Sequence, residues 1–202
     1  MAAAVGSDIG YYVQGIPETA LFSRQGRADA KARAFECMVR VNRMAARAGI
    51  ARVALEQMYT PHQPPFTIDA MRTLMRDVLA ESGHPFYLTE DVGHHCPFYA
   101  RPTEDALLAA CARFARDGYV EPWLGSREAL ALFTQNAGAG RLSRAVLDAL
   151  FEDFDKNADQ FASAQDADCY AWLESLGAWS PVIHMQQTDG QHSSTVEIGR
   201  AS

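Results

Sequence analysis

The chain has 202 residues, of which 48% are hydrophobic and 21% are charged, and its formal net charge is -7. This length suits one folded domain, and the composition lies far from that of intrinsically disordered proteins. The negative charge argues against a protein that coats nucleic acid or an anionic membrane.

The cysteines and the first residues indicate a reducing compartment. The four cysteines are scattered and form no C-x-x-C pair: Cys37, Cys96, Cys111 and Cys169. The first ten residues, MAAAVGSDIG, lack the positive start and the apolar run of a signal peptide, and no run of about 18 apolar residues occurs. We therefore expect a cytoplasmic protein that does not span a membrane.

The first quarter of the chain holds one strand-like segment and a long helical pattern. The segment IGYYVQG, from Ile9 to Gly15, is rich in β-branched and aromatic residues, which favour strands. From Arg27 to Ala48 the apolar residues recur on one helical face, and Gly49 would end that helix. The sequence predicts that helical structure resumes from Ile50 to Tyr59, until TPHQPP breaks it.

A sequence pattern then occurs three times in the middle of the chain. In PFTIDA, PFYLTEDV and PFYARPTEDA, a Pro-Phe pair leads into threonine and acidic residues, which suit the N-terminus of a helix. This pattern predicts a helix capped by Thr67 and ended by Gly83, and a single helical turn after Thr89. It also predicts a helix from Thr103 to Asp117.

The last third continues the helical pattern and then changes period. Ser126, Ser143 and Ser163 each precede an amphipathic stretch as predicted caps. Residues 182–188 and 192–198 alternate around Asp189-Gly190, which is typical of a β-hairpin turn.

These elements predict a mainly α protein. Residues 1–180 would form one helical bundle of about six helices, and residues 181–202 a C-terminal hairpin or mobile tail. A small sheet could pair this hairpin with residues 9–15.

Oxygen-bearing residues alternate in DKNADQFASAQD, from Asp155 to Asp166. With the helical patterns on both sides, residues 147–173 resemble a degenerate EF-hand helix-loop-helix, and the resemblance implies a calcium site. Its ligands would be Asp155, Asn157, Asp159, Phe161 through its carbonyl, Ser163 and Asp166. The segment departs from the EF-hand pattern at Gln160, where a glycine is expected, and at Asp166, where a glutamate is expected. The alternative is an ordinary polar loop between two helices.

A second candidate site lies around residues 84–99. It contains His84, His94, His95 and Cys96. Imidazole and thiolate groups are ligands for zinc or iron, although adjacent residues such as His94 and His95 rarely bind one ion. Cys96 beside a histidine and Asp91 could instead act as a thiolate nucleophile. The alternative is a packed connection between two helices.

A basic helix face is the third candidate. Between Arg24 and Arg52 there are eight basic residues and two acidic ones, and Arg40, Arg43 and Arg47 share one helical face. Such a face suits phosphates, an acidic protein partner or self-association. No aromatic residue is interleaved with these arginines, so nucleic-acid binding is not expected.

The sequence alone favours a non-catalytic helical interaction or regulatory protein that responds to a divalent cation through the EF-hand-like loop. A basic helix, an acidic C-terminal half and no assembled catalytic set support this interpretation. The alternative is a metal-dependent or Cys/His-dependent enzyme with its site around residues 84–99. The cofactor would be calcium in the first case and zinc or iron in the second.

Overall fold

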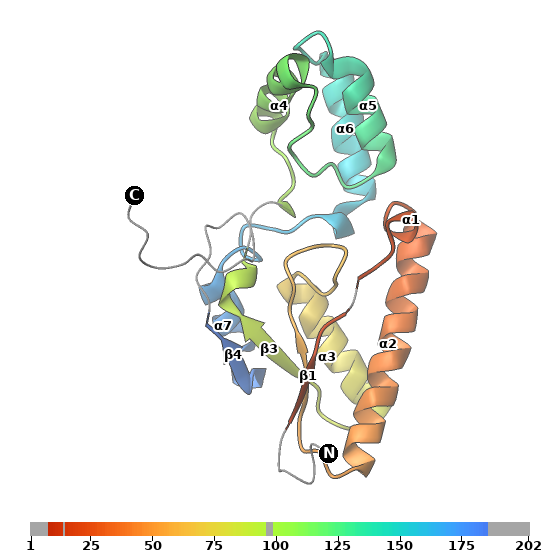
Figure 1. Cartoon of the computed structure of the whole chain (residues 1–202), viewed down its shortest axis with the longest axis vertical. Helices are drawn as coiled ribbons and strands as arrows, with labels where there is room; N and C mark the ends of the chain where they lie inside the picture. The colour runs from red at the N-terminus through yellow and green to blue at the C-terminus, as the bar shows by residue number, and fades with distance from the viewer. Residues whose placement is uncertain (1–7, 14, 96–98, 186–202) are drawn as a thin grey trace.

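The chain forms a parallel β-sheet with helices, so the prediction of a mainly α bundle is wrong (Figure 1). The computed structural model describes residues 8–13, 15–95 and 99–185. Its four strands are neighbours in chain order, and all three pairs are parallel. They are β1 (Ile9–Tyr11), β2 (Val53–Glu56), β3 (Tyr87–Asp91) and β4 (Val182–His184).

The strand register brings the carboxyl ends of the strands to one edge. Glu56 of β2 is paired with Thr89 of β3, and Asp91 at the end of β3 is paired with His184 at the end of β4. Because all strands run in the same direction, the residues that follow them meet on the same side of the sheet.

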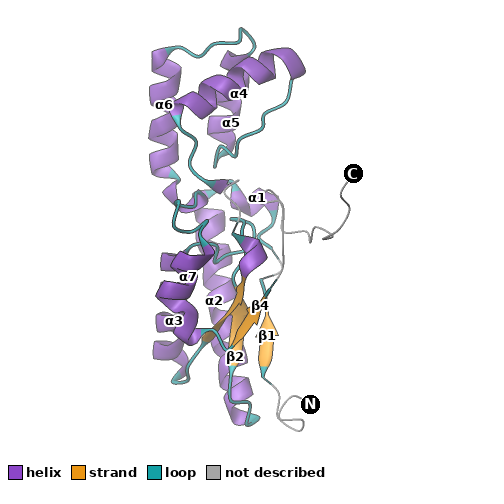
Figure 2. Cartoon of the chain, turned by 90° about the vertical axis from the view of Figure 1, so that its left-hand side faces the viewer, coloured by secondary structure: helices purple, strands orange, loops and turns teal. Residues whose placement is uncertain are grey.

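Helices cover one face of the sheet, as Figure 2 shows. They are α2 (Arg24–Arg47), α3 (Ile68–Ser82) and α7 (Cys169–Leu176), and the four-residue α1 (Glu18–Leu21) precedes α2. Their apolar sides pack on Leu55 and Leu88, and Trp172 of α7 is buried in the same core. Burial of this apolar surface stabilises the sheet at about 25 cal/mol per Å².

A second helical unit is inserted between β3 and α7. It consists of α4 (Glu104–Asp117), α5 (Arg127–Ala137) and α6 (Arg144–Lys156), and it has its own core around Leu107, Phe133 and Phe154. Figure 1 shows this unit beyond the end of the sheet toward which β3 points. Short 3₁₀ turns complete the described elements: η2 (Val92–His94), η4 (Ala158–Gln160) and η5 (Gly177–Trp179).

Helix caps were predicted well because they depend on local contacts. The hydroxyls of Thr67, Thr103, Ser126 and Ser143 accept hydrogen bonds from the backbone N–H groups three residues later. Ser163 does not cap α7, which begins at Cys169 with Asp168 as its cap.

Two helical predictions were wrong because short strands resemble helical turns in sequence. The predicted helix from Ile50 to Tyr59 contains β2, and Thr89, predicted as a helix cap, lies inside β3. A run of three to five residues is too short for its period to distinguish a strand from a helix. Pairing with distant segments therefore decides the structure.

The structure tests the predictions for the two chain termini only in part. The strand-like segment at residues 9–15 does contain β1, but β1 and β4 lie at opposite edges of the sheet and do not pair. Most of the predicted hairpin, residues 186–202, lies outside the described residues. Among the residues that the structure describes, no helix combines the length and the apolar character needed to cross a bilayer.

Candidate metal centre at the carboxyl edge of the sheet

Three potential metal ligands converge at the carboxyl edge of the sheet. Glu56 is the last residue of β2, Asp91 is the last residue of β3, and His94 ends the 3₁₀ turn that follows β3. One ligand atom from each of these residues lies within 4.8 Å of the other two. Two carboxylates and an imidazole at this spacing form a candidate cation site.

Local hydrogen bonds orient two of these side chains. The backbone N–H of Gly93 donates to Oδ1 of Asp91 at 2.8 Å, and Oδ2 lies 3.8 Å from Nε2 of His94. Nδ1 of His94 lies 2.8 Å from the carbonyl oxygen of Gln57. Since a carbonyl oxygen can only accept, this contact assigns the proton to Nδ1 and leaves the lone pair of Nε2 free for a cation.

A second histidine stands beside the two carboxylates. His184 ends β4, and its Nδ1 lies 3.0 Å from Oε1 of Glu56 and 3.5 Å from Oδ2 of Asp91. The side chain of His184 is 49% exposed, whereas that of Asp91 is only 7% exposed. The cluster is therefore anchored on a buried carboxylate and open on the side of His184.

A cavity of about 560 Å³ adjoins this cluster. It is lined by Gly10, Tyr11, Tyr12, Glu56, Thr89, Val182 and His184. Leu55 and Leu88 point into the core beneath the helices, so Glu56 and Thr89, one residue further along each strand, point to the opposite face. The cavity therefore gives a small molecule access to the candidate cation site from the face that the three helices do not cover.

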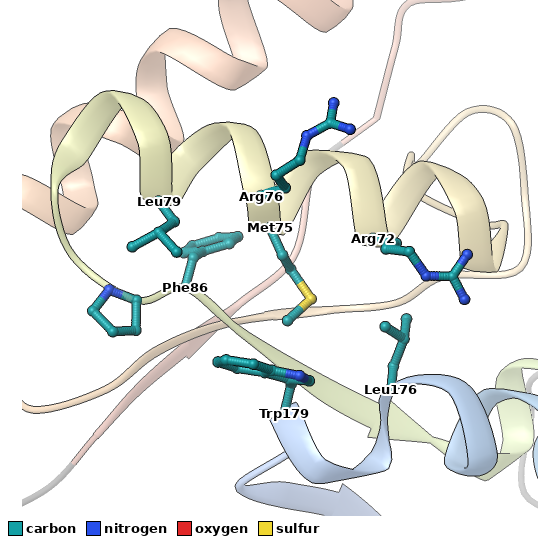
Figure 3. Close-up of a pocket in the computed structure, with 8 residues that line it drawn as sticks. Arg72, Met75, Arg76, Leu79, Phe86, Leu176 and Trp179 are labelled. Carbon is teal, nitrogen blue, oxygen red and sulfur yellow. The ribbon is translucent and has the colours of Figure 1, made fainter.

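Another cavity, of about 260 Å³, lies between α3 and α7 (Figure 3). Met75, Leu79, Phe86 and Trp179 converge on it, whereas the guanidinium of Arg76 points away. Among the described residues, those that line this cavity include no carboxylate, imidazole or thiol that could serve acid-base or metal chemistry.

The structure separates the three histidines among the candidates predicted around residues 84–99. His84 lies before β3, at the opposite end of that strand from the cluster. Nε2 of His95 lies 2.9 Å from Oε1 of Glu90, and this buried pair packs against the Trp172 ring on the helix side of the sheet. Cys96 lies outside the described residues. Of the described histidines in this set, His94 is the one that joins the cluster.

Glu56 was missed by sequence reasoning, and Asp91 was considered only as a companion of Cys96. Glu56 lay inside the predicted helix from Ile50 to Tyr59, and a helical assignment hides its position at the end of a strand. The useful signal in the sequence is an acidic residue directly after each of two short strand-like runs. Glu56 follows VAL, and Asp91 follows FYLTE.

The EF-hand interpretation of residues 147–173 is not supported. Helix α6 continues through Asp155 to Lys156, and Asp155 forms an ion pair with Arg101. Asn157 and Asp159 accept hydrogen bonds from Arg27, and Asp166 accepts hydrogen bonds from the backbone N–H groups of Ile68 and Ser163. Phe161 is buried in the α4–α6 core. These oxygens are engaged by protein groups from several elements, and calcium would have to displace them.

Asp159 shows the electrostatic consequence of these contacts. Burial raises the pKa of its carboxyl, but the hydrogen bonds and positive charges of Lys31 and Arg27 outweigh burial and hold the pKa below its ordinary value. The ion pair between Arg27 and Asp159 links α2 to the segment after α6. The side chain of Arg27 is only 2% exposed.

The predicted basic face lies on the exposed side of α2. Arg40, Arg43 and Arg47 are all exposed, and Arg43 forms an ion pair with Glu81 of α3. Binding of an acidic partner, or self-association through these arginines, stays a prediction.

The comparisons with known proteins bear on the fold. No protein-family model matches the chain, and no curated protein matches it. In fold the chain resembles the crystal structure of a putative xylose isomerase from Rhodospirillum rubrum, with a TM-score of 0.56 and 17% sequence identity. The similarity covers 95% of this chain and 44% of that chain, so this chain spans less than half the length of that protein.

This similarity agrees with the observed strand order. Consecutive parallel strands with helices on the outer face are the arrangement of a β/α barrel, and the four strands correspond to half of such a barrel. The similarity in fold corrects the interpretation of the chain as a helical regulatory protein.

Proposed function

We propose that Glu56, Asp91 and His94 bind one divalent cation, and that this cation serves an enzymatic reaction in the adjoining cavity. The observation that carries the proposal is the convergence of the three donor atoms within 4.8 Å at the carboxyl edge of a parallel sheet. Active sites of β/α barrels lie at this edge, because the loops after the strands converge there. The proposal keeps the metal-dependent form of the alternative predicted around residues 84–99.

The donor set favours a transition metal over calcium. Calcium takes about six to eight oxygen ligands, whereas an imidazole combined with carboxylates suits manganese, iron or zinc. His184 supplies a fourth donor in this proposal. Its separations from the two carboxylates, 3.0 and 3.5 Å, match ligands that surround one ion at about 2.1 Å and are therefore about 3.0–3.4 Å apart.

The chain's own residues define what could react there. The hydroxyls of Tyr12 and Thr89 belong to side chains that line the cavity and can exchange hydrogen bonds with a hydroxylated substrate. When bound, the cation would polarise a carbonyl or hydroxyl oxygen of that substrate as a Lewis acid. The name of the structural neighbour, a putative xylose isomerase, supports a sugar as the substrate class and isomerisation as the reaction class.

Cation binding is tested by calorimetric titration of the chelator-treated protein with Mn²⁺, Zn²⁺ and Ca²⁺. We expect one ion per chain with a preference for Mn²⁺ or Zn²⁺, and about a 100-fold loss of affinity in Glu56→Gln, Asp91→Asn or His94→Gln, because each variant removes a ligand. His84→Gln is the matched control, since His84 is an exposed histidine at the other end of β3. Equal binding by the parent protein and all three ligand variants would refute the site.

The reaction class is tested by incubating the cation-loaded protein with aldoses and ketoses and following interconversion by NMR. We expect turnover that disappears after chelation and returns with the cation. A protein that binds the cation but converts no sugar would retain the metal site and lose the proposed reaction.

A further inference from the structure

Gln57 occupies an unusual position beside the candidate cation site. It directly follows Glu56, and it is fully buried. Its backbone N–H donates to the carbonyl oxygen of Thr89 at 3.2 Å, which is the last backbone hydrogen bond between β2 and β3. Beyond this point the side chain of Gln57, instead of its backbone, forms the hydrogen bonds to β3.

The carboxamide of Gln57 bonds to both backbone groups of Asp91. Its Oε1 accepts from the N–H of Asp91 at 2.7 Å, and its Nε2 donates to the carbonyl oxygen of Asp91 at 2.9 Å. A carboxamide has the same donor and acceptor as a peptide group, so it can extend the strand pairing after the two backbones separate. Glutamate lacks the donor, and methionine, which has a similar size, lacks both groups.

All three proposed ligands are tied to Gln57. Glu56 is linked to it by a peptide bond, the backbone of Asp91 is bonded to its side chain, and Nδ1 of His94 contacts its backbone carbonyl oxygen at 2.8 Å. Any residue at position 57 would offer this backbone carbonyl to His94. The side chain of Gln57 therefore acts on the ligands by fixing the backbone of Asp91, and with it the turn that carries His94.

We infer that Gln57 is the positioning residue that sets the separation of Glu56, Asp91 and His94. It acts through these residues and does not touch the cation itself. Its effect on cation binding rests on the proposed function, whereas its hold on the turn after β3 can be measured without any cation. Outer groups that orient metal ligands typically change metal affinity by about 10-fold to 100-fold.

The test compares Gln57→Glu and Gln57→Met with Asn42→Asp. Asn42 is a matched control because it is also a buried amide, and it donates to Ser82 and to the carbonyl oxygen of His84, away from the cluster. We expect all three variants to lower the melting temperature, but only the two Gln57 variants to weaken Co²⁺ or Mn²⁺ binding about 10-fold to 100-fold. The visible absorption of bound Co²⁺, which reports ligand geometry, should change in these two variants alone.

Amide hydrogen exchange, measured by NMR on the cation-free proteins, separates the two hypotheses. In Gln57→Met the N–H of Asp91 loses its acceptor, and we expect it to exchange at least about 10-fold faster than in the parent protein or in Asn42→Asp. Unchanged exchange at Asp91 together with unchanged Co²⁺ spectra would overturn the positioning role. If the parent chain binds no cation but the Asp91 N–H still exchanges faster in Gln57→Met, the proposed function is refuted and Gln57 is still supported as the residue that holds the turn.

Discussion

Glu90 and Asp91 are adjacent residues at the end of β3, yet they face opposite sides of the sheet. Asp91 belongs to the open face with the cavity, whereas Glu90 lies on the helix side, where it is fully buried and pairs with His95. The residues of this pair flank the turn that carries Asp91 and His94. One short segment therefore presents ligands on one face and a buried ionisable pair on the other.

Removing one member of this pair should be costly. We expect Glu90→Ala to lower the free energy of unfolding by about 3 kcal/mol, because it leaves the buried imidazole of His95 without its carboxylate partner. Glu90→Gln keeps an acceptor at the same place and should cost less. Urea denaturation measures both values, and a Glu90→Ala protein as stable as the parent would contradict the structural importance of the pair.

At the scale of elements, the α4–α6 unit is attached to the rest of the molecule by specific polar and aromatic contacts. Arg27 of α2 bonds to Asp159 and Asn157 just after α6. The indole ring of Trp123, between α4 and α5, packs against the rings of Phe22 and His62. The unit has its own core, so these contacts determine how firmly it is held beside the sheet.

The Asp159 contact should make this attachment sensitive to acid. The folded-state pKa of Asp159 is below its ordinary value, so its contribution to stability is present above the unfolded-state pKa of about 4 and is lost as the pH falls through the folded-state pKa. We expect the parent protein to be more stable than Asp159→Asn at pH 6, with the difference shrinking toward pH 2. Thermal unfolding across this range measures the difference, and a gap independent of pH would contradict the ionic contact.

At the scale of the whole molecule, the proposed cation links three of the four strands. Ligands at the ends of β2, β3 and β4 come from segments that are far apart in the chain, so a bound ion would join them as a cross-link of the folded state.

Cation binding should therefore raise the melting temperature of the chain. At a free Mn²⁺ concentration of about 100 times the Kd, the gain in free energy of unfolding should be about 2.7 kcal/mol. Differential scanning calorimetry with and without a chelator measures this effect. The Asp91→Asn variant should show almost none of it, and an equal gain in that variant would point to binding elsewhere.

The sequence by itself determined what depends on neighbours along the chain. Helices capped by Thr67, Thr103, Ser126 and Ser143 were predicted correctly, because a cap and an apolar stripe involve residues a few positions apart. The sequence also indicates His94 as a potential ligand, since imidazole is a metal-binding group in any fold.

Only the tertiary structure decided the sheet and the composition of the site. Strand β2 was predicted as a helix, because its four residues gain their hydrogen bonds from β1 and β3 and carry little period of their own. The parallel register then brings Glu56 to Asp91 and His94, while it sends His95 to the other face and leaves His84 at the far end of β3. Residue types can be read along the chain, but which of them become neighbours depends on pairing between distant segments.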